Sequence, residues 1–410
     1  MTKTDILIIG AGPGGAATAL FLAKKGIHCT LVDKATFPRD KVCGDALSGK
    51  VGEVLKKLDP TLVSQLQQRS DFLGSYGVTF VAPSGQALRV PFRTEMNANT
   101  PAPGFIAKRL DFDNWLIEEV RKHPEITLLE NTELRHFHLS DMGYEVTSKS
   151  GEVFNAKLII AADGAYSSFA KEVAELETEP AHNCFGLRAY YKGVKGLDEQ
   201  NFIELHFLKE FLPGYFWIFP LPNGYANIGV GMRADVLHDK KINLKRDFEQ
   251  LIATHPLLRE RFSTAERIGE VKLHGLPLGS KKRPLSGDHY MLIGDAAMLI
   301  DPFTGEGIGN AMMTGMLAAE QAATCLASDD FSATTMLAYD QKVYNRLWSE
   351  LLLSYRMQQL VNYPSLFNFV VKKANNNKTL RETISAMFED MDLRARLKDP
   401  RFYFKLLFSH

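Results

Sequence analysis

Residues 2–34, TKTDILIIGAGPGGAATALFLAKKGIHCTLVDK, set the architecture that the remaining chain has to fit. Residues 5–9 form a short apolar run, typical of a strand buried on both faces, and a glycine-rich turn follows it. Residues 16–25 continue as a helix that Gly26 ends, because glycine readily takes the left-handed conformation found after helices. Residues 27–32 supply a second apolar strand. The stretch therefore predicts a strand, turn, helix and strand unit.

The turn places Gly10, Gly12 and Gly15 in G-x-G-x-x-G spacing, with Pro13 and Gly14 between them. The first glycine permits a tight turn, the second lets the backbone approach a diphosphate, and the third lets the helix pack against the strand. The start of the helix also presents unsatisfied N–H groups and a partial positive charge. The turn is thus a candidate site for the diphosphate of a dinucleotide.

Asp33 ends the second strand, twenty-three residues after Gly10. A carboxylate at this place accepts hydrogen bonds from a free ribose 2′-hydroxyl, so FAD or NAD fits better than NADP. A lone G-x-G-x-x-G is weak evidence, because glycines also cluster in ordinary turns. The flanking strand, helix and acid favour a dinucleotide site, although the motif does not choose between FAD and NAD.

The composition is that of an ordinary globular protein, since the 410 residues are 45% hydrophobic and 23% charged. Basic and acidic side chains balance, so no net charge favours nucleic acid or an anionic membrane. Without a signal-peptide pattern or a run of eighteen apolar residues, we expect a cytoplasmic protein. The four cysteines lie far apart, lack the spacing of a metal site, and are expected to be free thiols.

Downstream of the first unit, helical and extended patterns alternate. Residues 49–58 predict a helix, and residues 72–92, which Gly and Pro punctuate, predict a hairpin. The segment KRLDFDNWLIEEVRKHP (108–124) predicts another helix, with Asp111 as its N-cap and Pro124 beyond its end. Residues 126–162 carry four strand patterns, of which the middle ones are typical of an antiparallel meander.

Residues 183–273 are rich in strand patterns and in aromatic side chains, and only residues 244–254 predict a helix among them. Such a segment should form a sheet with a large apolar face, which suits a substrate chamber. The chain then returns to the first domain through a strand that ends at Gly294 and a helix at residues 305–327. Residues 332–360 predict a further long helix.

Two more aspartates follow buried strands: Asp163 in AADGAYSS and Asp295 in IGDAAMLIDPFTGEGIGNAMMTG. Asp295 is the stronger candidate, because its carboxylate could accept hydrogen bonds from the sugar-chain hydroxyls of a cofactor bound at the first turn. The helix that begins near Gly305 would direct its amides at the other end of that cofactor. The alternative is a helix start that is rich in glycine only for close packing.

The order of GxGxxG, PRDKVCG, KRLDFDNWL, ADGAYSS and GDAAMLIDPFTGEGI resembles that of the FAD-dependent oxidoreductases with the p-hydroxybenzoate hydroxylase fold. Residues 38–44 (PRDKVCG) and 215–220 (YFWIFP) resemble the geranylgeranyl reductase family among them. The resemblance covers residues 1–330. Ala170 departs from it, because an arginine is usual there, and so does the short spacing from Pro213 to the YFWIFP segment.

The resemblance implies a role for each matching position. The glycine turn would hold the diphosphate, Asp33 the adenosine ribose, Arg109 the middle of FAD, and Asp295 its ribityl chain. The cofactor-binding set is Gly10, Gly12, Pro13, Gly14, Gly15, Asp33, Lys34, Arg39, Cys43, Gly44, Arg109, Asp163, Gly164, Gly294, Asp295, Pro302, Gly305, Gly307 and Ile308. The set that would line a lipid-binding chamber is Phe207, Tyr215, Trp217 and Phe219.

These patterns together predict an α/β (α+β) fold with a Rossmann-like FAD-binding domain, a mixed β-sheet substrate domain and a helical C-terminal region. The FAD-binding domain is expected to be discontinuous, the segments being 1–71, 101–182 and 274–330. Residues 72–100 and 183–273 would form the substrate domain, and residues 331–410 the C-terminal region.

Cys43 is the cysteine best suited to a site role. It lies in a loop between Lys41 and Asp45, near Arg39, where cations are expected to lower the pKa of its thiol. The other interpretation is an inert small hydrophobe, the usual state of a free cysteine. By resemblance, Cys43 would be the proton donor or alkene-positioning group, with Tyr215 as the next candidate.

The resemblance implies an FAD-dependent oxidoreductase that reduces C=C bonds of a prenyl lipid. Two alternatives stay open: an aromatic monooxygenase that uses NAD(P)H and oxygen, and a non-catalytic FAD- or lipid-binding protein. Only one dinucleotide turn occurs, so NAD(P)H or another donor is expected to bind transiently. A flavin halogenase is not indicated, because Tyr215, Trp217 and Phe219 replace the W-x-W-x-I-P signature. The apolar residues at 388–408 predict either packing on a domain or a peripheral membrane contact.

Overall fold

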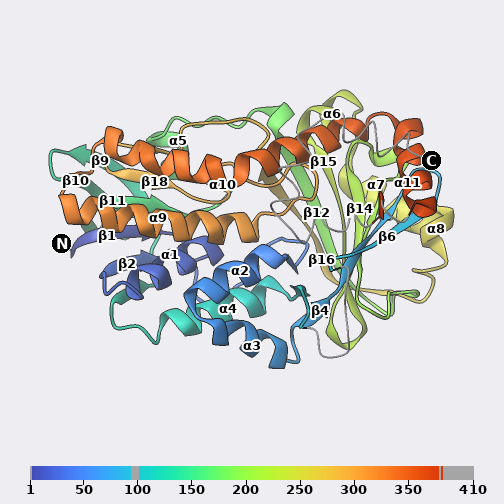
Figure 1. Cartoon of the computed structure of the whole chain (residues 1–410), viewed down its shortest axis with the longest axis horizontal. Helices are drawn as coiled ribbons and strands as arrows, with labels where there is room; N and C mark the ends of the chain where they lie inside the picture. The colour runs from blue at the N-terminus through green and yellow to red at the C-terminus, as the bar shows by residue number, and fades with distance from the viewer. Residues whose placement is uncertain (1, 94–100, 378–379, 382–410) are drawn as a thin grey trace.

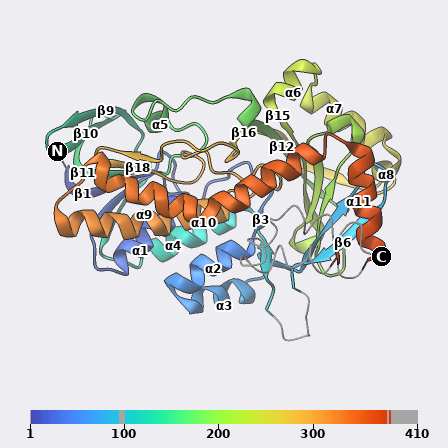
Figure 2. The same cartoon turned by 45° about the horizontal axis from the view of Figure 1, so that its top comes forward.

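The computed structural model of the chain describes residues 2–93, 101–377 and 380–381. The molecule is elongated, with two large sheets toward its opposite ends (Figures 1 and 2). The long helix α10 (Ala333–Leu360) runs along the molecule from the first sheet toward the second (Figure 1). The functional question is therefore what lies where the two sheets meet.

The first sheet contains the unit predicted from the start of the chain. Its main path runs in the order β17, β18, β11, β1, β2, β8, with parallel pairing from β18 to β8, while β10 and β9 extend it beside β11 as an antiparallel meander. Its strands are β1 (Thr2–Ile9), β2 (Cys29–Val32), β8 (Ile126–Leu129), β9 (Leu134–Ser140), β10 (Gly143–Ser148), β11 (Val153–Ala161), β17 (Ser286–Gly287) and β18 (Tyr290–Leu292).

The second sheet has the order β16, β12, β15, β14, β13, β5, β6, and every pair in it is antiparallel except β13 with β5. Its strands are β5 (Gly77–Val81), β6 (Ala87–Pro91), β12 (Asn183–Lys192), β13 (Ile203–His206), β14 (Tyr215–Pro220), β15 (Tyr225–Arg233) and β16 (Glu266–Pro277). A small third sheet joins β3 (Ala46–Leu47), β7 (Gly104–Ile106) and β4 (Leu73–Ser75).

Helices cover both large sheets. Helix α1 (Pro13–Ala23) is buried along its whole length, which explains why it is apolar on every side, and it packs against α9 (Ile308–Ser328). The other helices are α2 (Gly49–Leu58), α3 (Pro60–Gln68), α4 (Arg109–Val120), α5 (Ser168–Glu172), α6 (Ala234–Asp239), α7 (Leu244–Thr254), α8 (Pro256–Arg259) and α11 (Pro364–Asn376). Three 3₁₀ turns occupy Pro180–His182, Lys209–Phe211 and Pro222–Gly224.

The architecture confirms the predicted fold class, since a mostly parallel sheet with helices stands beside a second, mixed sheet. Helix α9 begins at Ile308, later than predicted, because Gly305 has a φ of +73° that a helix does not allow. The N-cap of α4 is Lys108, so Asp111 lies in its first turn. The small sheet and the helices α3, α5, α6 and α8 were not predicted.

Two expectations about the chain's organisation are not tested by the fold. The division into domains stays a prediction, although strands from residues 77–91 and 183–277 share one sheet as it requires. The apolar residues at 388–408 lie outside the described part of the chain. Among the helices that the structure describes, none is both long and apolar enough to span a membrane.

Candidate active site

A cavity of about 1770 Å³ lies where the two large sheets meet. Sites for drug-sized ligands typically measure roughly 300–1,000 Å³, so this cavity has room for more than one small molecule. One part is polar and contains the glycine turn and several aspartates, and we call it the cofactor half. The other part has apolar walls, and we call it the apolar chamber; its walls include Phe80, Leu205, Trp217, Leu360, Phe367 and Val371.

The glycine turn has the geometry that its spacing predicts. Gly10 has a φ of +97°, and a Cβ there would lie 2.5 Å from Ala162 O at the end of β11. A Cβ on Gly15 would lie 1.9 Å from Gly10 O, so α1 can approach β1 only with glycine at this position. By contrast, a Cβ on Gly12 would meet only Arg39 Nη2, at 3.6 Å, and Gly12 lines the cavity.

A chain of ion pairs runs behind the glycine turn. Asp33 Oδ2 accepts a hydrogen bond from Ala11 N at 2.8 Å and lies 3.6 Å from Arg39 Nη2. Arg39 also donates to Asp113, at 3.1 Å. Asp113 in turn accepts two 2.6 Å hydrogen bonds from the buried Arg109. The pairing fixes both arginines at the cavity wall, where they could attract an anionic group.

Asp295 lines the cavity, and Lys41 Nζ donates to it at 3.0 Å. Burial alone would raise the pKa of Asp295, but Lys41 outweighs it and holds that pKa below its ordinary value. His274 stands nearby, and burial with the charge of Lys41 lowers its pKa to about 4. Asp295 is therefore an anionic acceptor beside a neutral imidazole at neutral pH.

Several buried polar atoms at the cavity wall have no hydrogen-bond partner within the described part of the protein. They include Asp163 Oδ1 and His274 Nε2. Burial also raises the pKa of Asp163 above its ordinary value. Unpaired buried polar atoms are costly, so these atoms point to a polar ligand that satisfies them.

These features fit FAD. The open approach at Gly12 with Arg39 beside it suits a diphosphate, while Asp33 and Asp295 offer carboxylate acceptors for ribose and ribityl hydroxyls. Asp163 offers an unpaired oxygen at the same cavity wall. Within the described residues no group of three or more His, Cys, Asp or Glu could hold a metal ion.

The loop before α9 borders both parts of the cavity. Asp301 Oδ1 fixes the loop by accepting from Phe303 N and Thr304 N at 2.9 and 2.8 Å. Tyr215 OH donates to Thr304 O at 2.6 Å, which ties the loop to β14. The hydroxyl proton of Tyr215 is thus held in the hydrogen bond to Thr304 O, and burial raises the pKa of Tyr215 above its ordinary value.

Cys43 lines the cavity, but its thiol differs from the prediction. Burial raises the pKa of Cys43 above its ordinary value, although Arg109 opposes the shift, so the prediction of a lowered pKa was wrong. Asn227 Nδ2 holds the loop by donating to Cys43 O at 2.8 Å, and Asn227 Oδ1 accepts from Trp217 Nε1 at 2.9 Å. The thiol is therefore a protonated group on a fixed loop, rather than a thiolate.

Most of the predicted site residues line one cavity. Those at its wall are Gly10, Gly12, Pro13, Gly14, Asp33, Lys34, Arg39, Cys43, Gly44, Arg109, Asp163, Gly164, Tyr215, Trp217, Phe219, Gly294, Asp295, Gly305, Gly307 and Ile308. Three predicted residues lie behind the wall: Gly15 packs against Gly10, Pro302 O accepts from Gln358, and Phe207 packs on Phe303.

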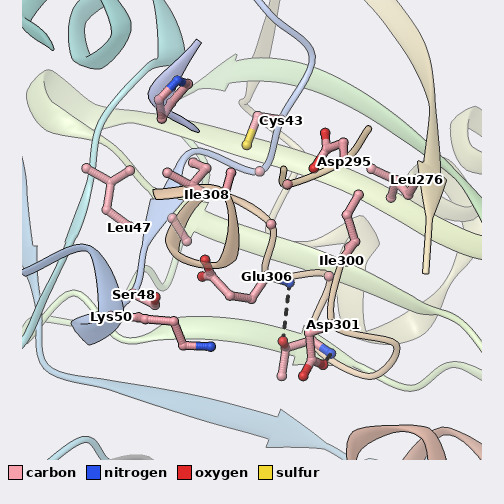
Figure 3. A pocket seen from close by; sticks show the side chains of 18 of the residues that line it. Cys43, Leu47, Ser48, Lys50, Leu276, Asp295, Ile300, Asp301, Glu306 and Ile308 are labelled. Carbon is pink, nitrogen blue, oxygen red and sulfur yellow. Dashed lines mark hydrogen bonds between the residues drawn. The ribbon is translucent and has the colours of Figure 1, made fainter. Parts of the chain in front are cut away.

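Two groups of side chains at the site were not predicted from the sequence. The first consists of apolar side chains on α10 and α11, among them Leu360, Leu366 and Phe367, which close the apolar chamber. The second is polar and surrounds Glu306 and Lys50 between α2, α9 and α10 (Figure 3). No local spacing in the sequence connects either group to the glycine turn, so neither could be found without the fold.

Comparison with known proteins adds the family. An FAD binding domain family matches residues 3–188. The menaquinone reductase of Mycobacterium tuberculosis is 31% identical to this chain over 333 residues, which cover 78% of this chain and 76% of that protein. The protein belongs to the geranylgeranyl reductase family of FAD-dependent oxidoreductases.

Other members of the geranylgeranyl reductase family agree with this assignment. The digeranylgeranylglycerophospholipid reductase of Thermoplasma volcanium is 28% identical over 351 residues, which are 84% of each chain. A geranylgeranyl bacteriochlorophyll reductase-like protein from Thermoplasma acidophilum shares the fold, with a TM-score of 0.79, 23% identity and coverage of 99% and 98% of the two chains. The protein described here is thus an FAD-dependent oxidoreductase, and FAD is its cofactor.

Proposed function

We propose that this protein reduces isolated C=C bonds of a prenyl lipid. The observation that carries the proposal is the continuity of one cavity, which passes from the carboxylates of the cofactor half into the apolar chamber. The chamber walls come from β5, β13, β14, α10 and α11, and they offer aliphatic and aromatic surfaces suited to a hydrocarbon chain.

The names of the curated relatives support a prenyl lipid as the substrate class. One relative is called a digeranylgeranylglycerophospholipid reductase and another a menaquinone reductase. Both names describe reductases, and both substrates carry isoprenoid chains. The relatives therefore favour reduction over the hydroxylase alternative and over a non-catalytic binding protein.

FAD, when bound, supplies the hydride chemistry. The residues that would hold it are those of the cofactor half: the turn at Gly12 with Arg39 for the diphosphate, Asp33 for the adenosine ribose, and Asp295 for the ribityl chain. Gly307 and Ile308 would direct backbone amides at the ring system. These are the roles that the family resemblance implies for these residues, and the position of each residue at the cavity wall supports them.

An isolated alkene has no carbonyl to polarise, so the protein must act through position and the exclusion of water. The aromatic side chains of Trp217 and Phe219 would hold the lipid chain, and Phe207 would support Tyr215, whose ring it contacts. Cys43 would position the alkene at the boundary with the cofactor half. Its raised pKa makes the thiol a weak acid, which favours positioning over proton donation. The Tyr215 hydroxyl donates its hydrogen bond to Thr304 O, so a positioning role suits Tyr215 as well.

Electrons would come from NAD(P)H or another donor that binds transiently, since the chain has one dinucleotide turn. A lipid substrate also favours a peripheral membrane contact. Tyr363, Leu366 and Phe369, on α11 or directly before it, are exposed apolar side chains, and Leu366 also lines the chamber. These exposed side chains are the surface that best supports such a contact.

Anaerobic flavin spectroscopy tests the proposal. Enzyme reduced with dithionite and mixed with geranylgeranyl diphosphate or a menaquinone should recover the absorbance of oxidised flavin. Cys43→Ala should slow this recovery without loss of FAD, because the thiol lies at the chamber boundary. The hydroxylase alternative gains support if prenyl lipids leave the flavin reduced while a phenol with oxygen oxidises it.

A further inference from the structure

Ser48, Lys50 and Glu306 lie near one another at a polar part of the cavity wall (Figure 3), and Glu350 of α10 also lines the cavity. Glu306 belongs to the loop that borders the apolar chamber, where Thr304 O accepts from Tyr215 and Phe303 stacks on Phe207. The carboxyl side chain is therefore placed between the apolar chamber and this polar part of the cavity wall.

The Glu306 carboxyl is held in a fixed position. Its Oε1 accepts a hydrogen bond from Gly309 N at 2.5 Å. A Cβ on Gly309 would lie 2.9 Å from that oxygen, 3.0 Å from Ser48 Oγ and 2.9 Å from Lys50 Cβ. Atoms of the three side chains therefore surround one point at the first turn of α9, which places Ser48 Oγ beside the Glu306 carboxyl.

The surroundings of Glu306 favour its neutral form. Burial raises the pKa of Glu306 above its ordinary value, against the opposing effects of Lys50, the Gly309 N–H and the Ser48 hydroxyl. A carboxyl that keeps its proton closer to neutral pH remains a stronger acid than a buried thiol or phenol, so it transfers a proton more readily. Glu306 thus combines a fixed position with a proton that it can give up.

Further polar groups at the cavity wall lie between this carboxyl and the surface. Lys50 Nζ donates to Asn310 Oδ1 at 2.5 Å and to Glu350 Oε1 at 2.9 Å, and its side chain is only 9% exposed. Ser48 Oγ is buried at the cavity wall beside Glu306. Beyond Lys50 the cavity wall continues along α2 to the exposed Lys56.

We propose that Glu306 is the source of the proton that the reduction consumes, and that Ser48, Lys50 and Glu350 connect it to solvent. The proposal rests on the function proposed above. One alkene carbon gains a hydride from the reduced flavin, and the neighbouring carbon gains the Glu306 proton, directly or through one water. The π bond breaks, two C–H bonds form, the flavin is oxidised, and solvent returns a proton to the Glu306 carboxylate.

Four other acidic groups at the cavity wall fit this task less well. The pKa values of Cys43 and Tyr215 are raised by burial, which makes both groups weak acids, and the Tyr215 proton is donated to Thr304 O. Asp301 uses its Oδ1 to accept two loop amides. Asp295 is paired with Lys41, which keeps the pKa of Asp295 low. Of these five groups, Glu306 suits the task best.

The first test replaces the acid and keeps its acceptor. Glu306→Gln retains an oxygen for Gly309 N, so a purely capping role of Glu306 would be preserved. We expect FAD binding to stay within about twofold, while anaerobic oxidation of the reduced flavin by a prenyl lipid slows by roughly 100-fold or more. Glu320→Gln, the same change on the exposed side of α9, is the matched control and should leave the rate unchanged.

The pH profile separates a proton source from a structural residue. In the wild-type protein the oxidation rate should fall as pH rises through the pKa of Glu306, because only the neutral carboxyl can donate. In Glu306→Gln this dependence should disappear, whereas Cys43→Ala should slow the reaction and keep it. An unchanged rate and pH profile in Glu306→Gln would overturn the proposal.

The route to solvent has its own test. In Lys50→Met the rate of the first turnover of reduced enzyme should stay within about threefold of the wild-type rate, because the Glu306 carboxyl begins protonated. The later turnovers should be slower, because the Glu306 carboxylate is reprotonated slowly. Equal rates in all turnovers would exclude Lys50 from the route. Titration of the ¹³C-labelled Glu306 carboxyl in the FAD-free protein gives a readout without activity, and a pKa at or below its ordinary value would contradict the proposal. Wild-type enzyme that no prenyl lipid oxidises would instead reject the proposed function.

Discussion

The cofactor half and the apolar chamber share one cavity, but different interactions give them their shape. Backbone atoms shape the cofactor half, since Gly15 has to lie against Gly10 and Gly10 against Ala162. Side chains from five separate elements shape the apolar chamber. A Cβ added at Gly10 or Gly15 would lie too close to a backbone atom for any side chain to fit there. Apolar cores, by contrast, tolerate the exchange of one side chain for another of similar volume. The comparison suggests that the cofactor is fixed by the fold, while substrate choice can vary with the chamber walls.

The largest effect is expected at the glycine turn. In Gly15→Ala the new Cβ would lie 1.9 Å from Gly10 O, so α1 has to move away from β1. We expect loss of bound FAD and a destabilisation of more than about 3 kcal/mol, measured by flavin absorbance after purification and by the melting temperature. Gly52→Ala on α2, where a Cβ would meet nothing within 4 Å, is the control and should not destabilise the protein. Retention of FAD in Gly15→Ala would show that the backbone does not fix this half.

Asp295→Ala should have the next largest effect and should remain confined to the cofactor half. It removes the acceptor for the ribityl hydroxyls and leaves Lys41 without its 3.0 Å partner. We expect the dissociation constant of FAD to rise roughly 10- to 100-fold, the loss of one or two charge-assisted hydrogen bonds, as measured by titration of the FAD-free protein. Lys41→Met removes only the counter-ion and should weaken FAD less. Full FAD occupancy in Asp295→Ala would remove this residue from the cofactor site.

A smaller and separate effect is expected in the apolar chamber. Leu366 on α11 lines the chamber and is 44% exposed, so Leu366→Gln should not threaten the fold. We expect the KM for a prenyl lipid to rise about five- to tenfold, because roughly 1 kcal/mol of apolar contact is lost, with kcat and FAD binding unchanged. Leu337→Gln on α10, where the side chain is also exposed, is the control. An equal KM in both variants would exclude α11 from lipid binding.

The smallest effect concerns Asp45, which supports the loop between the two halves. Burial raises the pKa of Asp45 to about 6, while Tyr190 OH, which donates to it at 2.7 Å, opposes this rise. The folded-state pKa of Asp45 lies above the ordinary value of 3.8, so the folded protein favours the protonated carboxyl. The stability that this protonation contributes is present below pH 3.8 and is lost as pH rises through 6. Tyr190→Phe should raise the pKa further, as measured by ¹³C NMR of the carboxyl carbon. A lower pKa in that variant would show that the hydrogen bond does not act as assigned.

The same contrast explains what the sequence could predict. The glycine turn, Asp33 and Asp295 were accessible because each lies at a fixed offset from a buried strand, and the fold class followed from the same periodicity. Glu306 and Lys50 were missed, because α2 and α9 meet only in the folded chain. The thiol of Cys43 was predicted in the wrong direction, since neighbouring cations are visible in the sequence while the burial that outweighs them is not.

The substrate walls show a similar limit. The aromatic segment YFWIFP was identified from the sequence, and Tyr215, Trp217 and Phe219 line the cavity. Phe207 was also predicted to line the chamber, but it packs behind the wall against Phe303 and Phe367. Period-two patterns predict which side chains share a face, but a closing helix such as α11 decides which of them reach a cavity.

The central claim is that the cavity brings an alkene of a prenyl lipid to the flavin and reduces it. The most direct measurement is the mass of the lipid product after a single anaerobic turnover of the reduced enzyme in D₂O. We predict that the product gains two deuterium atoms on adjacent carbons for each flavin oxidised, with no oxygen added. A lipid recovered unchanged, or a product that carries oxygen once air is admitted, would contradict the account.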